Sequence, residues 1–192
     1  MSTKGNKGKL VIISGPSGAG KSTICRRVVE CLDACLSVSA TTRPKGAAEI
    51  EGKDYYFLSP QEFKRQLDEG LFLEHADVFG NWYGTPRKPV ENALAEGRIV
   101  ILEIDVQGGL QVKAEIPDAV MIFILPPRLE ELLKRIDARR RGEDDAARQK
   151  RLAKAEAEIA VGKENYKYFV VNDVLDKAVQ DVIDIIHGHE KR

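Results

Sequence analysis

Residues 10–22 read L-V-I-I-S-G-P-S-G-A-G-K-S, and this stretch decides the fold of the core. Residues 15–22 match the pattern G-x-x-x-x-G-K-[ST], which is typical of loops that bind phosphate groups. An apolar run precedes the motif and a helical stretch follows it, which is the setting that the motif requires. Its glycines let backbone N–H groups turn toward an anion, and the helix adds its positive N-terminal end. The alternative is a glycine-rich turn with an incidental lysine, but every fixed position of the pattern is present.

The residue types of this loop suit a nucleoside triphosphate. Lys21 would reach the outer phosphates, and the Ser22 hydroxyl would ligate Mg²⁺. The predicted triphosphate-binding segment consists of Gly15, Pro16, Ser17, Gly18, Ala19, Gly20, Lys21, Ser22 and Thr23.

Charge and composition exclude several classes of protein. Lysine plus arginine number 30 and aspartate plus glutamate number 30, so the formal net charge is zero. This balance argues against a protein that coats nucleic acid or an anionic membrane. The polar N-terminus has no apolar segment of the secretory kind, and the apolar runs are too short to span a membrane. The three cysteines lack C-x-x-C spacing, so we expect reduced thiols and a cytoplasmic location.

Short apolar runs rich in valine and isoleucine alternate with longer amphipathic segments. Strands with apolar residues on both faces that alternate with helices indicate an α/β fold with a parallel β-sheet flanked by helices. The predicted strands are 9–14, 36–40, 99–104, 120–125 and 169–171, and the predicted helices are 21–32, 89–96, 129–139, 146–163 and 175–187.

Two segments break this alternation. Residues 39–88 hold a short helix and a strand-like run at 71–79, which indicates a small β-rich insertion. Residues 128–158 are rich in charge, with R-R-R-G-E-D-D at 139–145. A solvated helical hairpin is the ordinary interpretation, but beside a triphosphate site the segment could be a mobile arginine-bearing lid. The predicted core then comprises 9–38, 89–127 and 159–192.

Several further motifs with specific spacing carry a family resemblance. They are S-V-S-A-T-T-R at 37–43, G-K-D-Y at 52–55, Glu74, N-W-Y-G-T at 81–85 and V-N-D at 171–173. With the phosphate loop, they resemble the guanylate kinase family over most of the chain. The resemblance implies a P-loop NTPase core with a GMP-binding insertion and a helical lid, Mg²⁺ as cofactor, and ATP and GMP as substrates.

The resemblance also implies the residues of the GMP site. The phosphate of GMP would lie near Arg43, which can grip it bidentately, and near two tyrosine hydroxyls. Glu74 would accept the N1–H and N2 amino protons of guanine together, which adenine cannot supply. A site of this kind can reject the wrong base by a factor of about 10⁴. The implied GMP-binding residues are Ser39, Arg43, Tyr55, Glu74, Tyr83, Thr85 and Asp105.

Acidic and basic residues elsewhere complete the implied site. Glu103 ends a predicted strand beside the loop, where it would orient the metal through water, although a strand-end salt bridge is the alternative.

Positioned cations stabilise the transferring phosphoryl group, and the implied catalytic set is Lys21, Arg43, Arg141 and Arg151. Arg135 and Arg148 are possible helpers, and the alignment could slip from Arg141 onto Arg140. Asn172 and Asp173 match the loop against the adenine of ATP.

One position departs from the family pattern. The family usually has a second phosphate-binding arginine three residues after the one that matches Arg43, and this chain has Gly46 there, beside Lys45. Lysine supplies charge without the fork of a guanidinium. We therefore expect weaker GMP binding than in relatives that have both arginines.

Two other kinds of protein share parts of these patterns. A catalytically inactive scaffold module would lose loop and lid residues that are present here. A small kinase for a phosphorylated sugar would have little use for Glu74 together with Ser39 and Thr85. The sequence therefore favours a guanylate kinase, and it does not indicate the oligomeric state.

Overall fold

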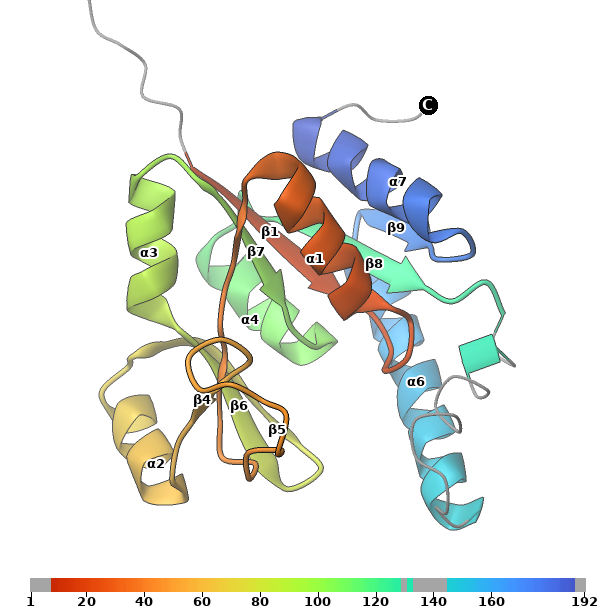
Figure 1. The fold of residues 1–192 in the computed structure, drawn as a ribbon. Coiled ribbons are helices and arrows are strands. Elements are labelled where there is room, and N and C mark those ends of the chain that lie inside the picture. The colour runs from red at the N-terminus through yellow and green to blue at the C-terminus, as the bar shows by residue number, and fades with distance from the viewer. Residues whose placement is uncertain (1–7, 129–130, 133–144, 189–192) are drawn as a thin grey trace, which may run out of the picture.

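The computed structural model describes residues 8–128, 131–132 and 145–188 (Figure 1). In chain order the elements are β1 (Lys9–Ser14), α1 (Lys21–Leu32), β2 (Cys35–Leu36), β3 (Ala40–Thr41), β4 (Tyr56–Phe57), α2 (Pro60–Asp68), β5 (Phe72–Val78), β6 (Asn81–Pro86), α3 (Arg87–Ala95), β7 (Ile99–Glu103), α4 (Val106–Glu115), β8 (Val120–Leu125), α6 (Asp145–Asn165), β9 (Tyr168–Val171) and α7 (Leu175–His187).

A parallel sheet with the strand order β2-β7-β1-β8-β9 forms the core, which confirms the predicted fold class. The central strand β1 is apolar on both faces because helices cover both. Val11 and Ile13 pack on the side of α1 and α7, whereas Leu10 and Ile12 pack against side chains of α3, α4 and α6 (Figure 1). Alternate side chains of a strand point to opposite faces, so a continuous apolar run is what this position demands.

A second, four-stranded sheet lies beside the core, with the order β4-β3-β6-β5 (Figure 1). Strands β5 and β6 form an antiparallel hairpin, and β3 pairs with β6 on one side and β4 on the other. The helix α2 covers this sheet through Phe63, which is 1% exposed and stacks on Phe72. A small separate apolar cluster thus holds the second sheet together, as expected for a β-rich insertion.

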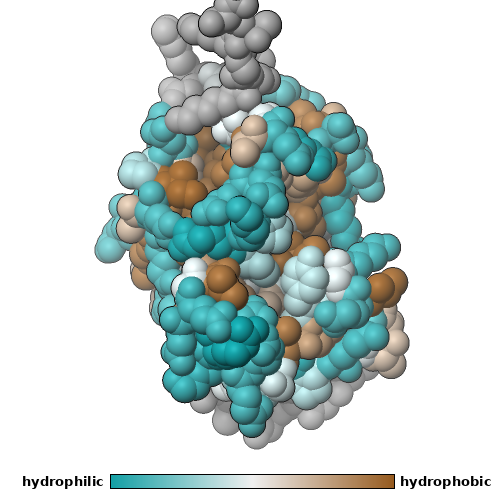
Figure 2. Space-filling view, turned by 90° about the vertical axis from the view of Figure 1, so that its left-hand side faces the viewer, coloured by the Kyte–Doolittle hydropathy of each residue, from teal (hydrophilic) through white to brown (hydrophobic). Residues whose placement is uncertain are grey.

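On the face seen from the left-hand side of Figure 1, hydrophilic residues dominate and hydrophobic ones appear in separate small groups (Figure 2). Among the described residues, no helix has the length and apolar character needed to cross a membrane.

The structure corrects the prediction of one strand at 36–40. The chain leaves the core sheet after Leu36, which pairs with Ile101, and Ala40 already pairs with Gly84 in the second sheet. Residues 37–39 therefore connect two sheets, and the apolar pattern alone could not show this change of partner.

Three elements were not predicted, namely the two-residue strand β4, the strand β6 and the helix α4. The strand β6 contains glycine and proline, which weaken a strand pattern, and α4 contains Gly108 and Gly109, which weaken a helix pattern. The predicted helix 129–139 lies almost wholly outside the described residues. The predicted boundaries of the core, insertion and lid stay predictions.

A buried chain of hydrogen bonds joins the end of α6 to the core sheet. The Tyr166 hydroxyl donates to Ser14 Oγ at 2.7 Å, and Ser14 Oγ donates to the carbonyl oxygen of Ile104 at 2.9 Å. Burial raises the pKa of Tyr166 to about 12, so the phenol stays protonated and remains a donor.

We predict that Tyr166→Phe lowers the free energy of unfolding by about 1–2 kcal/mol, because it leaves the buried Ser14 oxygen without its donor. Urea denaturation measures this loss. Ser14→Ala combined with Tyr166→Phe should cost less than the sum of the two single changes. Additive losses, or an unchanged midpoint for Tyr166→Phe, would contradict the proposed link.

Candidate active site

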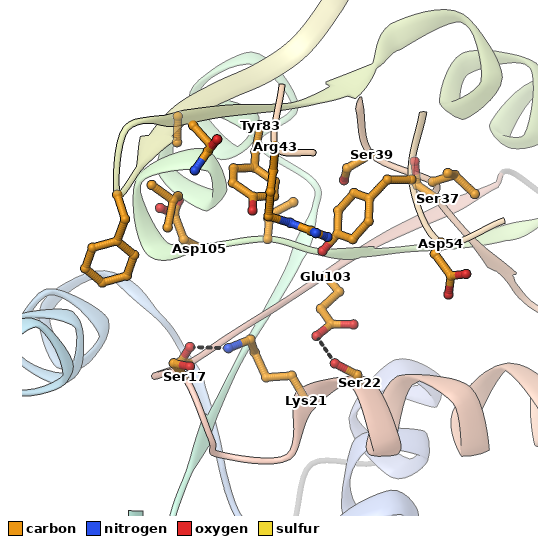
Figure 3. Close-up of a pocket in the computed structure, with 18 of the residues that line it drawn as sticks. Ser17, Lys21, Ser22, Ser37, Ser39, Arg43, Asp54, Tyr83, Glu103 and Asp105 are labelled. Atoms are coloured by element: carbon orange, nitrogen blue, oxygen red, sulfur yellow. Dashed lines mark hydrogen bonds between the residues drawn. The ribbon is translucent and has the colours of Figure 1, made fainter. Parts of the chain in front are cut away.

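The carboxyl ends of the core strands and one side of the second sheet border a common cleft of about 1470 Å³. The phosphate loop and Glu103 line it from the core, and Arg43 and Tyr83 line it from the insertion (Figure 3). The tertiary structure thus brings together side chains that are far apart in the sequence.

The phosphate loop depends on glycine at two positions for different reasons. Gly15 has a φ of 146°, and a Cβ atom there would lie 2.3 Å from the carbonyl oxygen of Ile124 on the neighbouring strand β8. Gly20 has a φ of 93° at the start of α1, a conformation that side chains disfavour. The loop therefore needs glycine for close backbone approach and for its turn into the helix.

Lys21 folds back onto the loop from which it comes. Its Nζ donates to the carbonyl oxygens of Gly15 at 2.5 Å and Pro16 at 3.2 Å. Burial lowers the pKa of this lysine, while the nearby carboxylates of Glu103, Glu158 and Asp105 act in the opposite direction. The ammonium group of Lys21 thus lies near three carboxylates that line the cleft.

Ser22 and Glu103, the two predicted metal-site residues, are in direct contact. The Ser22 hydroxyl donates to Glu103 Oε1 at 2.6 Å (Figure 3). Within the part of the chain that the structure describes, no three histidine, cysteine or acidic side chains gather around one point. A hydroxyl and a carboxylate suit a hard cation such as Mg²⁺, which keeps several waters and takes phosphate oxygens as its other ligands.

Asn172 holds the phosphate loop in place. Its Nδ2 donates to the carbonyl oxygen of Ala19 at 2.7 Å, and its backbone N–H donates to Leu125 at 2.8 Å. The neighbouring Asp173 is exposed. Contact of either residue with adenine stays a prediction.

Arg43, Tyr55 and Tyr83 form one cluster on the insertion side of the cleft. The Arg43 guanidinium lies 5.5 Å from the ring centre of Tyr55, and the two tyrosine rings are 5.8 Å apart. The Glu49 carboxylate raises the pKa of Arg43, and the nearby Tyr83 hydroxyl acts in the same direction. One guanidinium and two phenols thus converge as the predicted phosphate subsite requires.

Glu49 is a residue of this subsite that the sequence analysis missed. Its carboxylate accepts two hydrogen bonds from Arg43, at 2.6 and 3.0 Å, and one from the Gly46 N–H at 2.6 Å. The Arg43 guanidinium and the Gly46 N–H hold the pKa of Glu49 below its usual value. The only signal in the sequence was an acidic residue six positions after Arg43 in a short loop.

Glu74 is a buried carboxyl group at the inner end of the insertion side. It is 4% exposed, and its Oε1 accepts a hydrogen bond from Thr85 Oγ1 at 2.6 Å. Burial raises the pKa of Glu74 to about 7, with a further contribution from Asp105, while the Thr85 hydrogen bond lowers it. Ser39 and Asp105 also line the cleft, so the predicted base-reading residues share one region.

The helix α6 closes the remaining side of the cleft with Arg151, Lys154 and Glu158. Lys154 lies 4.5 Å from the ring centre of Phe79, which sits at the tip of the β5–β6 hairpin, so α6 and the second sheet meet at this point. Of the other predicted lid arginines, Arg135, Arg140 and Arg141 lie outside the described residues, and so does the side chain of Arg148.

Comparison with known proteins identifies the family. A family model described as guanylate kinase matches residues 7–189. The chain is 49% identical to a guanylate kinase of Clostridium perfringens, covering 98% of this chain and 87% of that protein. It is 48% identical to a guanylate kinase of Caldanaerobacter subterraneus subsp. tengcongensis, covering 100% of this chain and 92% of that one.

A solved structure of guanylate kinase from Anaplasma phagocytophilum agrees with these relatives. Its TM-score is 0.79 at 34% sequence identity, and the match covers 97% of this chain and 88% of that one. The chain therefore belongs to the guanylate kinase family, whose members are transferases that act on nucleoside monophosphates.

Proposed function

We propose that this protein transfers the γ-phosphoryl group of ATP to GMP, giving ADP and GDP, and that it also accepts dGMP. The single observation that carries the choice of acceptor is the buried Glu74 carboxylate, held by Thr85 on the wall of the same cleft as the phosphate loop. Guanine offers two adjacent N–H donors to such a carboxylate. Adenine would leave it unpaired, which costs a buried charged acceptor several kcal/mol.

ATP would bind along the loop formed by residues 15–23, with its outer phosphates at Lys21. The Lys21 ammonium donates hydrogen bonds to two carbonyl oxygens of its own loop. Phosphate oxygens carry more negative charge than carbonyl oxygens, so the triphosphate competes well for this lysine. The loop keeps its shape because Asn172 is bound to Ala19.

Ser22 and Glu103 would hold Mg²⁺, the carboxylate acting through water. The cation would neutralise charge on the triphosphate during transfer. The fit rests on the two oxygen donors that already meet at 2.6 Å beside the loop. Lys21 lies near the Glu103 carboxylate, and its positive charge partly balances the negative charge of that group.

GMP would place its phosphate among Arg43, Tyr55 and Tyr83. Arg43 forms an ion pair with Glu49, so the phosphate would share Arg43 with this carboxylate or displace it. Two phenols add neutral donors without raising the positive charge of the subsite. We assign Ser39 and Asp105 to the contacts around the base and ribose.

The cations that stabilise the transferred group would come from both sides of the cleft. Arg43 acts from the insertion, Lys21 from the loop, and Arg151 with Arg141 from the lid. Arg151 lies on α6 at the wall of the cleft, which supports this assignment. We also propose a cytoplasmic location, which the free thiols of Cys25, Cys31 and Cys35 suit.

A coupled assay of ADP release with ATP and Mg²⁺ tests the proposal, with GMP, dGMP, AMP, CMP, UMP and a sugar phosphate offered in turn. We expect turnover with the two guanine nucleotides and at least 100-fold lower kcat/KM with AMP. Equal use of a sugar phosphate would favour a different kinase, and binding of GMP without ADP release would favour a scaffold module.

The pKa of Glu74 predicts how GMP use depends on pH. Guanine needs the ionised carboxylate, and with a pKa of about 7 the ionised fraction falls from about one half at pH 7 to about one tenth at pH 6. We expect the titration of Glu74 by itself to lower kcat/KM for GMP about fivefold over this interval, while KM for ATP at saturating GMP stays constant.

Glu74→Gln is the control for this pH dependence, because GMP carries a phosphate that itself titrates at a pKa of about 6. The variant should lose most of its preference for GMP over AMP, and its pH profile should keep only the part due to the phosphate. The same pH profile in both proteins would rule out Glu74 as the titrating group.

Gly46→Arg should lower KM for GMP by about tenfold, because it adds a second guanidinium to the phosphate subsite. The backbone at this position has no positive φ, so an arginine is allowed. A Cβ atom there would lie 2.9 Å from Glu49 Oε2, the flexible end of a side chain that can shift and then pair with the new arginine.

Steady-state kinetics with varied GMP measures this change, with Gly46→Ala as the matched variant that adds a side chain without charge. Gly46→Ala should leave KM for GMP within about twofold. Equal KM values for the two variants would mean that the missing arginine does not limit GMP binding in this chain.

A further inference from the structure

The first turn of helix α4 contains two consecutive glycines that its own backbone does not require. Gly108 and Gly109 are both buried, and neither has a positive φ. Each glycine in a helix costs about 1 kcal/mol relative to alanine. A reason for them must therefore lie in what packs against this part of the helix.

Gly108 faces the carboxyl group of Glu74. A Cβ atom at Gly108 would lie 2.3 Å from Glu74 Oε2 and 2.9 Å from Glu74 Cδ, both inside the 3.0 Å limit that Cβ contacts essentially never cross. The space of one methyl group is thus filled by the carboxylate itself. With a methyl at this position, the carboxylate would have to move.

The carboxylate has little room to move elsewhere. Its other oxygen is bound to Thr85 Oγ1 at 2.6 Å, and both Glu74 and Thr85 are buried, at 4% and 0% exposure. The helix that carries Gly108 is fixed at this end, because Asp105 Oδ1 accepts from the Gly108 N–H at 2.9 Å. Helix α4 is also tied to β5 by two hydrogen bonds between Gln111 and the backbone of His75, the residue after Glu74.

We infer that Gly108 is a positioning residue for base selection: the absence of a side chain there fixes the place of the Glu74 carboxylate between Thr85 and the start of α4. This inference rests on the proposed role of Glu74 as the reader of guanine. Its consequence is that a single methyl group, added at a residue that does not itself line the cleft, lowers the preference for guanine over adenine.

Gly109 provides a contrast on the same helix. A Cβ atom there would lie 2.1 Å from the Tyr166 hydroxyl and 3.4 Å from Ile12, within the core and away from Glu74. An alanine at Gly108 would therefore clash with the Glu74 carboxylate, whereas an alanine at Gly109 would disturb the Tyr166–Ser14 hydrogen bond. Gly109→Ala should lower the melting temperature without changing base preference.

The experiment compares Gly108→Ala, Gly109→Ala, Glu74→Asp and the double variant Glu74→Asp/Gly108→Ala in the coupled assay with GMP and AMP. For Gly108→Ala we expect a rise of about tenfold in KM for GMP, a fall in the GMP-to-AMP ratio of kcat/KM, and KM for ATP within about twofold of the parent. The shorter aspartate draws the carboxyl group back from the methyl. In the Glu74→Asp background the alanine should therefore change KM for GMP by less than about twofold.

The outcomes separate this inference from the proposed function. An unmodified protein that does not phosphorylate GMP contradicts the function itself. An active protein whose Gly108→Ala variant keeps its GMP-to-AMP ratio, or whose two changes act additively, overturns the positioning role alone. If the melting temperature of Gly108→Ala falls below the assay temperature, the inference requires that adding Glu74→Asp raises the melting temperature again. It is overturned if this second change has no such effect.

Discussion

The parallel arrangement of the core strands is the constraint on which the rest of the structure depends. Strands β7, β1, β8 and β9 run in one direction, so their carboxyl ends lie at the same edge of the sheet. The phosphate loop follows β1, Glu103 ends β7, and Asn172 follows β9. These groups are far apart in the sequence, but all of them lie at the cleft because each follows or ends a strand of the same direction.

The groups that would bind phosphate and metal are hydrogen-bonded within the protein itself. Lys21 is bound to loop carbonyls, Ser22 to Glu103, and Arg43 to Glu49. These bonds hold charged side chains in place without leaving a buried charge unpaired. In the proposed reaction, the substrates would replace these internal partners with their own anionic groups, which favours ligands whose anionic groups match the positions of both cations.

The proposed reading of guanine by Glu74 would depend on a different kind of constraint, which is the absence of a side chain beside the carboxylate. Glu74 has neighbours on two sides, a hydroxyl from Thr85 and the bare backbone of Gly108. The Thr85 hydroxyl donates a hydrogen bond to Oε1 of Glu74, and the absence of a side chain at Gly108 leaves room for Oε2. Burial at the same place raises the pKa of Glu74. The burial that underlies the proposed selectivity therefore also makes the charge of Glu74 sensitive to pH near neutrality.

The sequence by itself determined the local features of this protein. The apolar run of β1, the phosphate loop and α1 follow from residues 9–32, since strand, glycine turn and helix signals are local there. Family spacing further indicated Arg43, Tyr55, Glu74 and Tyr83 as site residues. Only the tertiary structure decided that the chain changes sheets after Leu36, that Glu49 binds Arg43, and that α4 forms despite two glycines. These features depend on contacts between distant residues, which propensity and periodicity cannot record because both describe a residue by its neighbours in the chain.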